Sequence, residues 1–255
     1  MNASSSADNV LAWYWDNEAW SEYDVPLAVT EQIKRCDRDP EGRRIHPILM
    51  LQGDSGMFRQ HNGMVDLGMT YDRAVDNFIL QRIDGQQLPW TMVVLSEIED
   101  PGVLRSSVYR ELAIGARGIA FYRDPLSSGR RIEALPIWQE FPILRTEVDQ
   151  LMPVLRATHW TTWTAVASSS DVTIGTRDRG GECYVILSNA LAKPLDFQVS
   201  LFGLPYTPAM LTDFFTGQQI PMTVKEPAGI AAVSLGPHGT AVYRIEAQRA
   251  RHRAP

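Results

Sequence analysis

Cysteine is scarce in this sequence: Cys36 and Cys183 are the only two among 255 residues. Two cysteines so far apart do not make a disulfide framework, so we expect both to be reduced or buried thiols. No apolar run approaches the roughly 20 residues of a membrane span. Residues 1–6 lack the basic and apolar regions of a signal peptide. The sequence therefore favours a cytoplasmic location by default, with no membrane partner.

An excess of positive charge is also missing. The chain has 24 basic and 30 acidic residues, a formal net charge of −6. The basic cluster within residues 34–44 is diluted by carboxylates, so we expect a solvated helix end and loop there, and no nucleic-acid partner. No set of histidines, cysteines and carboxylates has metal-ligand spacing, and no glycine-rich phosphate loop precedes a helix. We expect neither a metal nor another cofactor.

Residues 1–157 alternate short apolar runs with stretches of helical spacing. Continuous apolar strands separated by helices are typical of a parallel sheet covered on both faces. The pattern predicts five strand–helix units. The expected strands are Val10–Trp15, Ile48–Leu51, Met64–Tyr71, Trp90–Leu95 and Gly118–Tyr122, and the expected helices are Pro26–Cys36, 72–82, Leu104–Ile114 and Trp138–Leu151, the last kinked or divided at Pro142.

The pattern changes after residue 157. Short alternating runs punctuated by Gly, Pro, Asn and Asp predict an antiparallel β-sandwich domain over residues 158–248, followed by a disordered tail at 249–255. Its expected strands are Val172–Ile174, Tyr184–Leu187, Leu195–Leu201, Ala231–Leu235 and Ala241–Ile245.

Two carboxylates follow buried strands. Glu18 comes after Asn17 at the end of an aromatic run, and Glu97 follows Ser96 after Met92–Leu95. Two carboxylates at the carboxyl ends of two strands are what hydrolysis of a glycosidic bond requires, since one protonates the leaving oxygen and the other attacks or activates water. Tryptophans around Glu18 would desolvate it and raise its pKa toward that of a useful acid. Asp16 is an alternative to Glu18 as the acid, and Glu99 and Asp100 are alternatives to Glu97 as the nucleophile.

The order of motifs resembles retaining glycoside hydrolases with a TIM barrel, in which the acid/base Glu follows an Asn. Val10–Glu18 is similar to their strand four, Val94–Glu97 to strand seven, and Tyr109–Tyr122 to the passage into strand eight. The segments 184–189, 211–217 and 235–243 resemble the small β-sandwich that such enzymes carry behind the barrel. The resemblance implies an α/β fold, a partial (β/α)8 barrel of about strands 4–8 followed by an all-β sandwich, with Glu18 as acid/base and Glu97 as nucleophile.

The same resemblance implies a carbohydrate substrate and an incomplete barrel. The expected substrate-binding residues are Asn17, Trp15, Trp20, Gln52, Asp54, Tyr71 and Tyr122. A complete barrel needs ~250 residues, so strands one to three would come from elsewhere. We expect self-association or a partner segment that completes the barrel. The alternative is a non-catalytic carbohydrate-binding or structural remnant. The Gly53-Asp-Ser-Gly56 stretch matches serine proteases, but its α/β surroundings argue against a nucleophilic Ser55.

Overall fold

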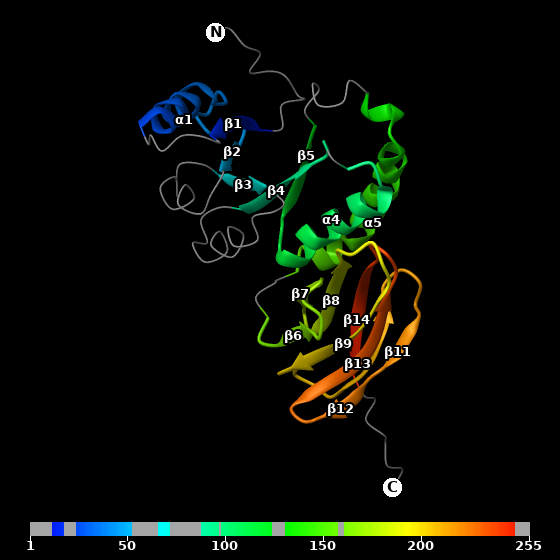
Figure 1. The fold of residues 1–255 in the computed structure, drawn as a ribbon. Helices are drawn as coiled ribbons and strands as arrows, with labels where there is room; N and C mark the ends of the chain where they lie inside the picture. The colour runs from blue at the N-terminus through cyan, green and yellow to red at the C-terminus, as the bar shows by residue number, and fades with distance from the viewer. Residues whose placement is uncertain are drawn as a thin grey trace. The chain divides into compact units, whose positions relative to one another are not determined.

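A computed structural model describes residues 12–17, 24–52, 66–71, 88–96, 98–123, 131–157 and 161–247 of the chain. The chain divides into two compact units. The first comprises Met1–Val94 and Ala116–Phe121, and the second comprises Leu95–Gly115 and Tyr122–Pro255. Each unit is described by itself. The elements of both are labelled in Figure 1.

The first unit is built on a five-stranded sheet whose strands lie in the order of the sequence, β1-β2-β3-β4-β5. Strands β1 to β4 pair in parallel. A sequential order of parallel strands is the order found in TIM barrels, whereas a doubly wound sheet reverses its strand order at a switch point. The strands are β1 (Trp13–Asn17), β2 (Ile48–Gln52), β3 (Leu67–Tyr71), β4 (Leu88–Val94) and β5 (Gly118–Tyr122).

Strand β2 shows why this sheet needs cover on both faces. Ile48 and Met50 pack with Leu27 and Ile33 of helix α1 (Asp24–Cys36). The alternate residues of β2 face the other way and join a second apolar cluster. That cluster is made of Leu49, Leu51, Met69 and Met92, with Ala12, Leu67, Trp90 and Ala120 packed against it. Both clusters are buried, which is why the run Ile48–Leu51 is continuously apolar.

The second unit contains the β-sandwich, and every strand pair within it is antiparallel over residues 161–247. One sheet has the order β11-β10-β14-β8-β7 and the other β12-β13-β9-β6. The strands are β6 (Thr164–Ala167), β7 (Val172–Arg179), β8 (Glu182–Asn189), β9 (Leu195–Phe202), β10 (Pro208–Asp213), β11 (Gln219–Pro221), β12 (Thr223–Lys225), β13 (Ala228–Leu235) and β14 (Thr240–Ala247). Their inward-facing side chains form one core around Trp163, which is 1% exposed.

Two helices belong to this second unit. Helix α4 (Pro101–Ile114) lies against β7 and β8, and α5 (Glu140–Leu155) packs on α4 (Figure 1). The short 3₁₀ turns η1 (Ile132–Ala134) and η2 (Pro136–Gln139) lead into α5. Tyr109 donates a hydrogen bond to Glu147 across the two helices at 2.7 Å, and Arg105 pairs with Glu140 and Glu147.

Each expected strand corresponds to a strand of the structure, with ends that differ by up to five residues, as at β7, which ends at Arg179 and not at Ile174. The expectation of antiparallel strands after residue 160 is confirmed for residues 161–247. The pattern missed β6, β11 and β12, which are short strands at the sheet edges, and it also missed β10, a six-residue strand inside its sheet. The kink expected at Pro142 is wrong. The chain changes from η2 to α5 at Glu140, and Pro142 lies in the first turn of α5, where a missing N–H costs nothing.

Several expectations stay open. The helix expected over residues 72–82 and the tail at 249–255 lie outside the described residues. The domain boundary at residue 157 stays a prediction, although compactness groups α4 and α5 with the sandwich. None of the described helices is long and apolar enough to cross a membrane.

Candidate functional site

Three of the expected substrate-binding residues are the last residues of successive strands. Strand β1 ends at Asn17, β2 at Gln52 and β3 at Tyr71. Asn17 and Gln52 are direct partners in the parallel register. Because carboxyl ends of parallel strands meet at one edge of a sheet, these three backbone positions share the edge at which barrel enzymes bind their substrates.

The segment that follows β4 lies in the second unit, next to the end of β5. The Leu95 N–H donates to the Tyr122 carbonyl at 2.7 Å, and the Ile98 N–H donates to the Leu95 carbonyl at 3.1 Å. Ile98 is 8% exposed, whereas the Tyr122 side chain is 46% exposed. Tyr122 is therefore a partly exposed residue whose backbone is hydrogen-bonded to Leu95, two positions before Glu97 in the sequence.

Other expected site residues lie outside the described residues. These are Glu18, Trp20, Asp54 and Glu97. Four more are described by their backbone alone: Trp15, Asn17, Gln52 and Tyr71. The carboxyl separation of ~5–5.5 Å expected of a retaining enzyme thus stays a prediction. Ser55 of the rejected protease motif also lies outside the described residues.

Trp90 has a packing role. A Cβ added to Gly118 would lie 2.3 Å from the Trp90 ring, so the ring covers the glycine on the neighbouring strand. Trp90 also contacts the apolar cluster formed by β2, β3 and β4. Trp90 is therefore a packing residue of the first unit.

Two hydrogen-bonded carboxylates among the described residues of the first unit, Asp37 and Asp66, lie near the opposite end of its strands. Asp66, directly before β3, accepts a hydrogen bond from the Ile48 N–H at 2.8 Å and pairs with Arg44. Asp37, 4% exposed, accepts from both the backbone N–H and Nδ1 of His46 at 2.8 Å. In a barrel this amino-terminal edge serves stability rather than chemistry. His46 is thus placed to fix the α1–β2 loop.

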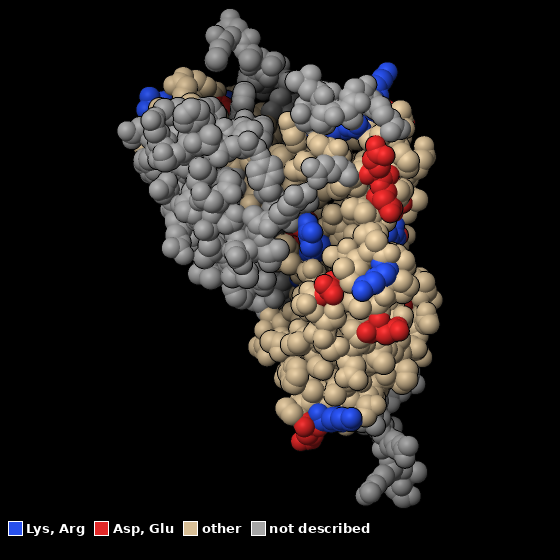
Figure 2. Space-filling view, viewed as in Figure 1, with Lys and Arg blue, Asp and Glu red and all other residues tan. Residues whose placement is uncertain are grey.

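The surface of the second unit mixes both signs of charge. Figure 2 shows acidic and basic side chains interspersed over the described part of the face in view. This distribution agrees with the net charge of −6 and does not favour a polyanionic partner. Among the described residues, no group of three or more His, Cys, Asp or Glu side chains is arranged to hold a metal ion.

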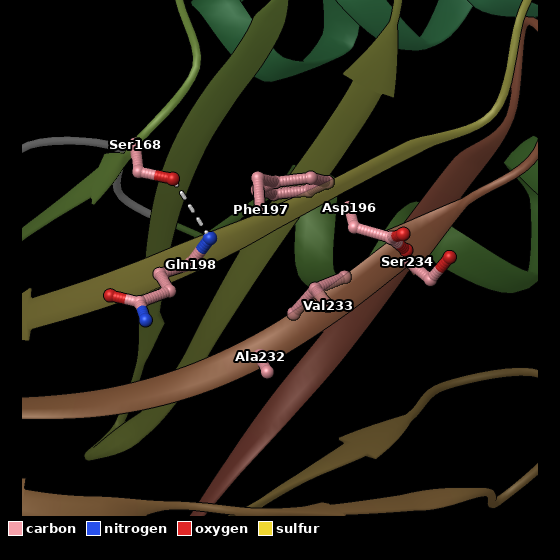
Figure 3. Close-up of a pocket in the computed structure, with 7 residues that line it drawn as sticks. All are labelled: Ser168, Asp196, Phe197, Gln198, Ala232, Val233 and Ser234. Carbon is pink, nitrogen blue, oxygen red and sulfur yellow. Dashed lines mark hydrogen bonds between the residues drawn. The ribbon is translucent and has the colours of Figure 1, made fainter.

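A groove of about 490 Å³ lies over β9 and β13 of the sandwich (Figure 3). Asp196 is its one carboxylate among the described lining residues, and Ser168 Oγ accepts a hydrogen bond from the Gln198 N–H at 2.9 Å. The Phe197 ring belongs to the sandwich core. One carboxylate cannot supply both the acid and the nucleophile of glycoside hydrolysis, so this groove is not the catalytic site.

Comparison with solved structures finds proteins of similar fold. The chain is similar to AmyP in complex with maltose, with a TM-score of 0.59, 12% identity, and coverage of 94% of this chain and 65% of that one. It is also similar to the α-amylase of Geobacillus thermoleovorans in complex with acarbose, with a TM-score of 0.58, 12% identity, and coverage of 90% and 58%. A third similar structure is the maltogenic α-amylase AmyB of Thermotoga neapolitana, with a TM-score of 0.55, 12% identity, and coverage of 94% of this chain and 62% of that one.

The chain therefore spans 58–65% of the length of these amylases. No family model and no curated protein matches the sequence. At 12% identity the similarity shows a shared fold. The chain has the fold of glycoside hydrolases, which agrees with the barrel-type strand order of the first unit.

Proposed function

We propose that this chain is the carboxy-terminal part of a retaining glycoside hydrolase, with Glu18 as acid/base and Glu97 as nucleophile. The observation that carries the proposal is the sequential parallel sheet, in which β1, β2 and β3 end at Asn17, Gln52 and Tyr71. The proposal is supported by the similar fold of two α-amylases, of whose length this chain covers 62% and 58%.

The chemistry follows from two carboxyl groups with different protonation. Protonated Glu18 donates its proton to the glycosidic oxygen while the Glu97 carboxylate attacks the anomeric carbon. The leaving group departs as an alcohol, and a glycosyl-enzyme ester forms on Glu97. Deprotonated Glu18 then takes a proton from water, which attacks the same carbon and releases Glu97. Two inversions give net retention, and neither step needs a cofactor.

The proposed substrate is a carbohydrate. Similar structures hold maltose and maltotriose, which supports a sugar ligand for this fold. Asn17, Gln52 and Asp54 would donate to and accept from sugar hydroxyls, and Trp15 and Trp20 would stack on sugar faces. Tyr71 and Tyr122 would donate to the nucleophile carboxylate and keep it ionised.

We propose further that a partner segment, or a second copy of the chain, completes the barrel. Among the described strands β1 and β5 are the ends of the sheet. On β5, Phe121 is 41% exposed, although large apolar side chains on barrel strands are ordinarily covered. Uncovered strand edges pair readily with other strands. Light scattering of the purified chain is expected to show self-association, unless a segment with three more strand–helix units is supplied.

The test is hydrolysis of aryl glycosides by the chain alone and by the chain joined to the coding region that precedes it. Glu97→Ala should abolish turnover, and added azide should restore release of the aryl group. Azide then attacks in place of the carboxylate, so a single displacement yields a glycosyl azide of inverted configuration. With Glu18→Ala the glycosyl-enzyme still forms from a good leaving group, and azide gives the retained product.

Matched controls are the neighbouring carboxylates. Glu99→Gln changes an exposed residue two positions from Glu97, and Asp16→Asn changes the residue in register with Leu51. Both variants should keep most of the activity. Loss of activity in Glu99→Gln with full activity in Glu97→Ala would transfer the nucleophile role to Glu99. Sugar binding without turnover in the completed protein would favour the carbohydrate-binding remnant.

A further inference from the structure

Helix α4 is fixed to the sandwich at its carboxyl end by buried contacts. Arg177 of β7, 3% exposed, donates to the Leu112 carbonyl and, at 3.5 Å, to the Ala113 carbonyl. These carbonyls belong to the last turn of the helix, where a cation is stabilised by the helix dipole. A Cβ added to Gly175 would lie 1.9 Å from the Ala113 carbonyl oxygen, so the two backbones touch directly.

The middle and the start of α4 are held by the same unit. Ser188 of β8, 2% exposed, donates its hydroxyl to the Ser106 carbonyl at 2.8 Å. At the amino end, a Cβ added to Gly102 would meet the His238 Cβ at 3.3 Å, so the β13–β14 turn packs on the first helical turn. Sequence reasoning missed these contacts, because Arg177 and Ser188 are ordinary polar residues in alternating strands.

The segment before α4 has little freedom of its own. The Leu95 N–H donates a hydrogen bond to the Tyr122 carbonyl, and the N–H of the buried Ile98 donates one to the Leu95 carbonyl. Asp100 caps the helix, because its carboxylate accepts a hydrogen bond from the Gly102 N–H at 2.7 Å. Leu95, Ile98 and Asp100 thus lie within a few residues of the start of α4, and we expect a shift of the helix to move them with it.

We infer that Arg177, Ser188 and Gly175 are positioning residues, through which the sandwich sets the place of the segment that precedes α4. The catalytic meaning of this inference rests on the proposed function, in which that segment carries the nucleophile Glu97. The sandwich then contributes to the rate of the chemical step, since a 1 Å misplacement of a reacting group costs up to ~100-fold in rate.

The experiment compares Ser188→Ala and Arg177→Met with Ser234→Ala, an exposed serine on β13 of the other sheet. Hydrogen exchange of the full chain is the first readout. Ser188→Ala should speed amide exchange over residues 98–112 roughly fivefold, the equivalent of one hydrogen bond. The core strands β8 and β14 should keep their protection, and Ser234→Ala should change neither region. Arg177→Lys should restore part of the protection lost in Arg177→Met, because it keeps the charge.

The second readout is steady-state kinetics of the barrel-completed protein. A positioning role predicts that kcat falls roughly tenfold or more with KM nearly unchanged, and that Arg177→Lys recovers part of kcat. Two results would overturn the inference. One is amide exchange that rises evenly over the whole second unit, and the other is an unchanged kcat in a variant whose amide exchange over residues 98–112 is faster. Absence of turnover in the wild-type completed protein would instead refute the proposed function, and the exchange pattern would still decide whether the sandwich holds this segment.

Discussion

Gly175 lies so close to α4 that its replacement by alanine tests how the helix is held. The added Cβ would lie 1.9 Å from the Ala113 carbonyl oxygen and 2.5 Å from the carbonyl carbon, and both belong to backbone that no side-chain rotation can move. Reaching an ordinary contact of 3.4 Å requires β7 and α4 to separate by about 1.5 Å.

That separation also breaks neighbouring bonds. The Ser188–Ser106 bond, now 2.8 Å, would exceed hydrogen-bonding distance, and the Arg177 contacts to the helix carbonyls would lengthen with it. Overpacking costs about 1–3 kcal/mol, one neutral hydrogen bond about 1 kcal/mol, and bonds from a buried charge somewhat more. After partial relaxation we expect a loss of about 3–5 kcal/mol in the free energy of unfolding of the second unit.

Urea and thermal unfolding measure this loss. For a unit of about 150 residues the melting temperature should fall by roughly 10 °C. Gly236→Ala is the matched control, because a Cβ there meets nothing within 4 Å, and its effect should stay within about 0.5 kcal/mol. Equal stabilities of the two variants would show that β7 and α4 do not touch as described, and the anchoring of α4 would have to be abandoned.

Two further substitutions test other contacts. Burial and the hydrogen bond to Glu147 raise the pKa of Tyr109 above its ordinary 10.0, so the folded state holds the phenolic proton more tightly. The stability that this provides is present below pH about 10 and is lost as the pH rises further. Tyr109→Phe should cost about 1 kcal/mol at pH 7 and flatten this alkaline loss, measured by urea unfolding at pH 7 and 11. Gly118→Ala should displace the Trp90 ring and destabilise the first unit by about 1–3 kcal/mol, which proteolytic susceptibility would report, and Trp90→Leu should relieve part of it.

The sequence by itself determined the type and order of the elements. The unbroken apolar run Ile48–Leu51 indicated a strand that is covered on both faces, as β2 is. Period-two alternation indicated strands that are covered on one face, as β9 and β13 are. Glycine and proline fixed most breaks. The resemblance of Asn17–Glu18 and Ser96–Glu97 to glycosidase motifs directed attention to the strand ends, and the parallel register brings Asn17 and Gln52 together there.

Tertiary structure alone decided which elements share a compact unit. Helix α4 is interleaved in sequence with the barrel strands, yet it packs on the sandwich, because Gly175 leaves room for the helix backbone and Arg177 and Ser188 satisfy its carbonyls. It also decided that the Trp90 ring covers Gly118 on the neighbouring strand. Such contacts join residues far apart in the chain. Local propensity and periodicity carry no information about them, because the partner that satisfies a buried group is set only when the chain has folded.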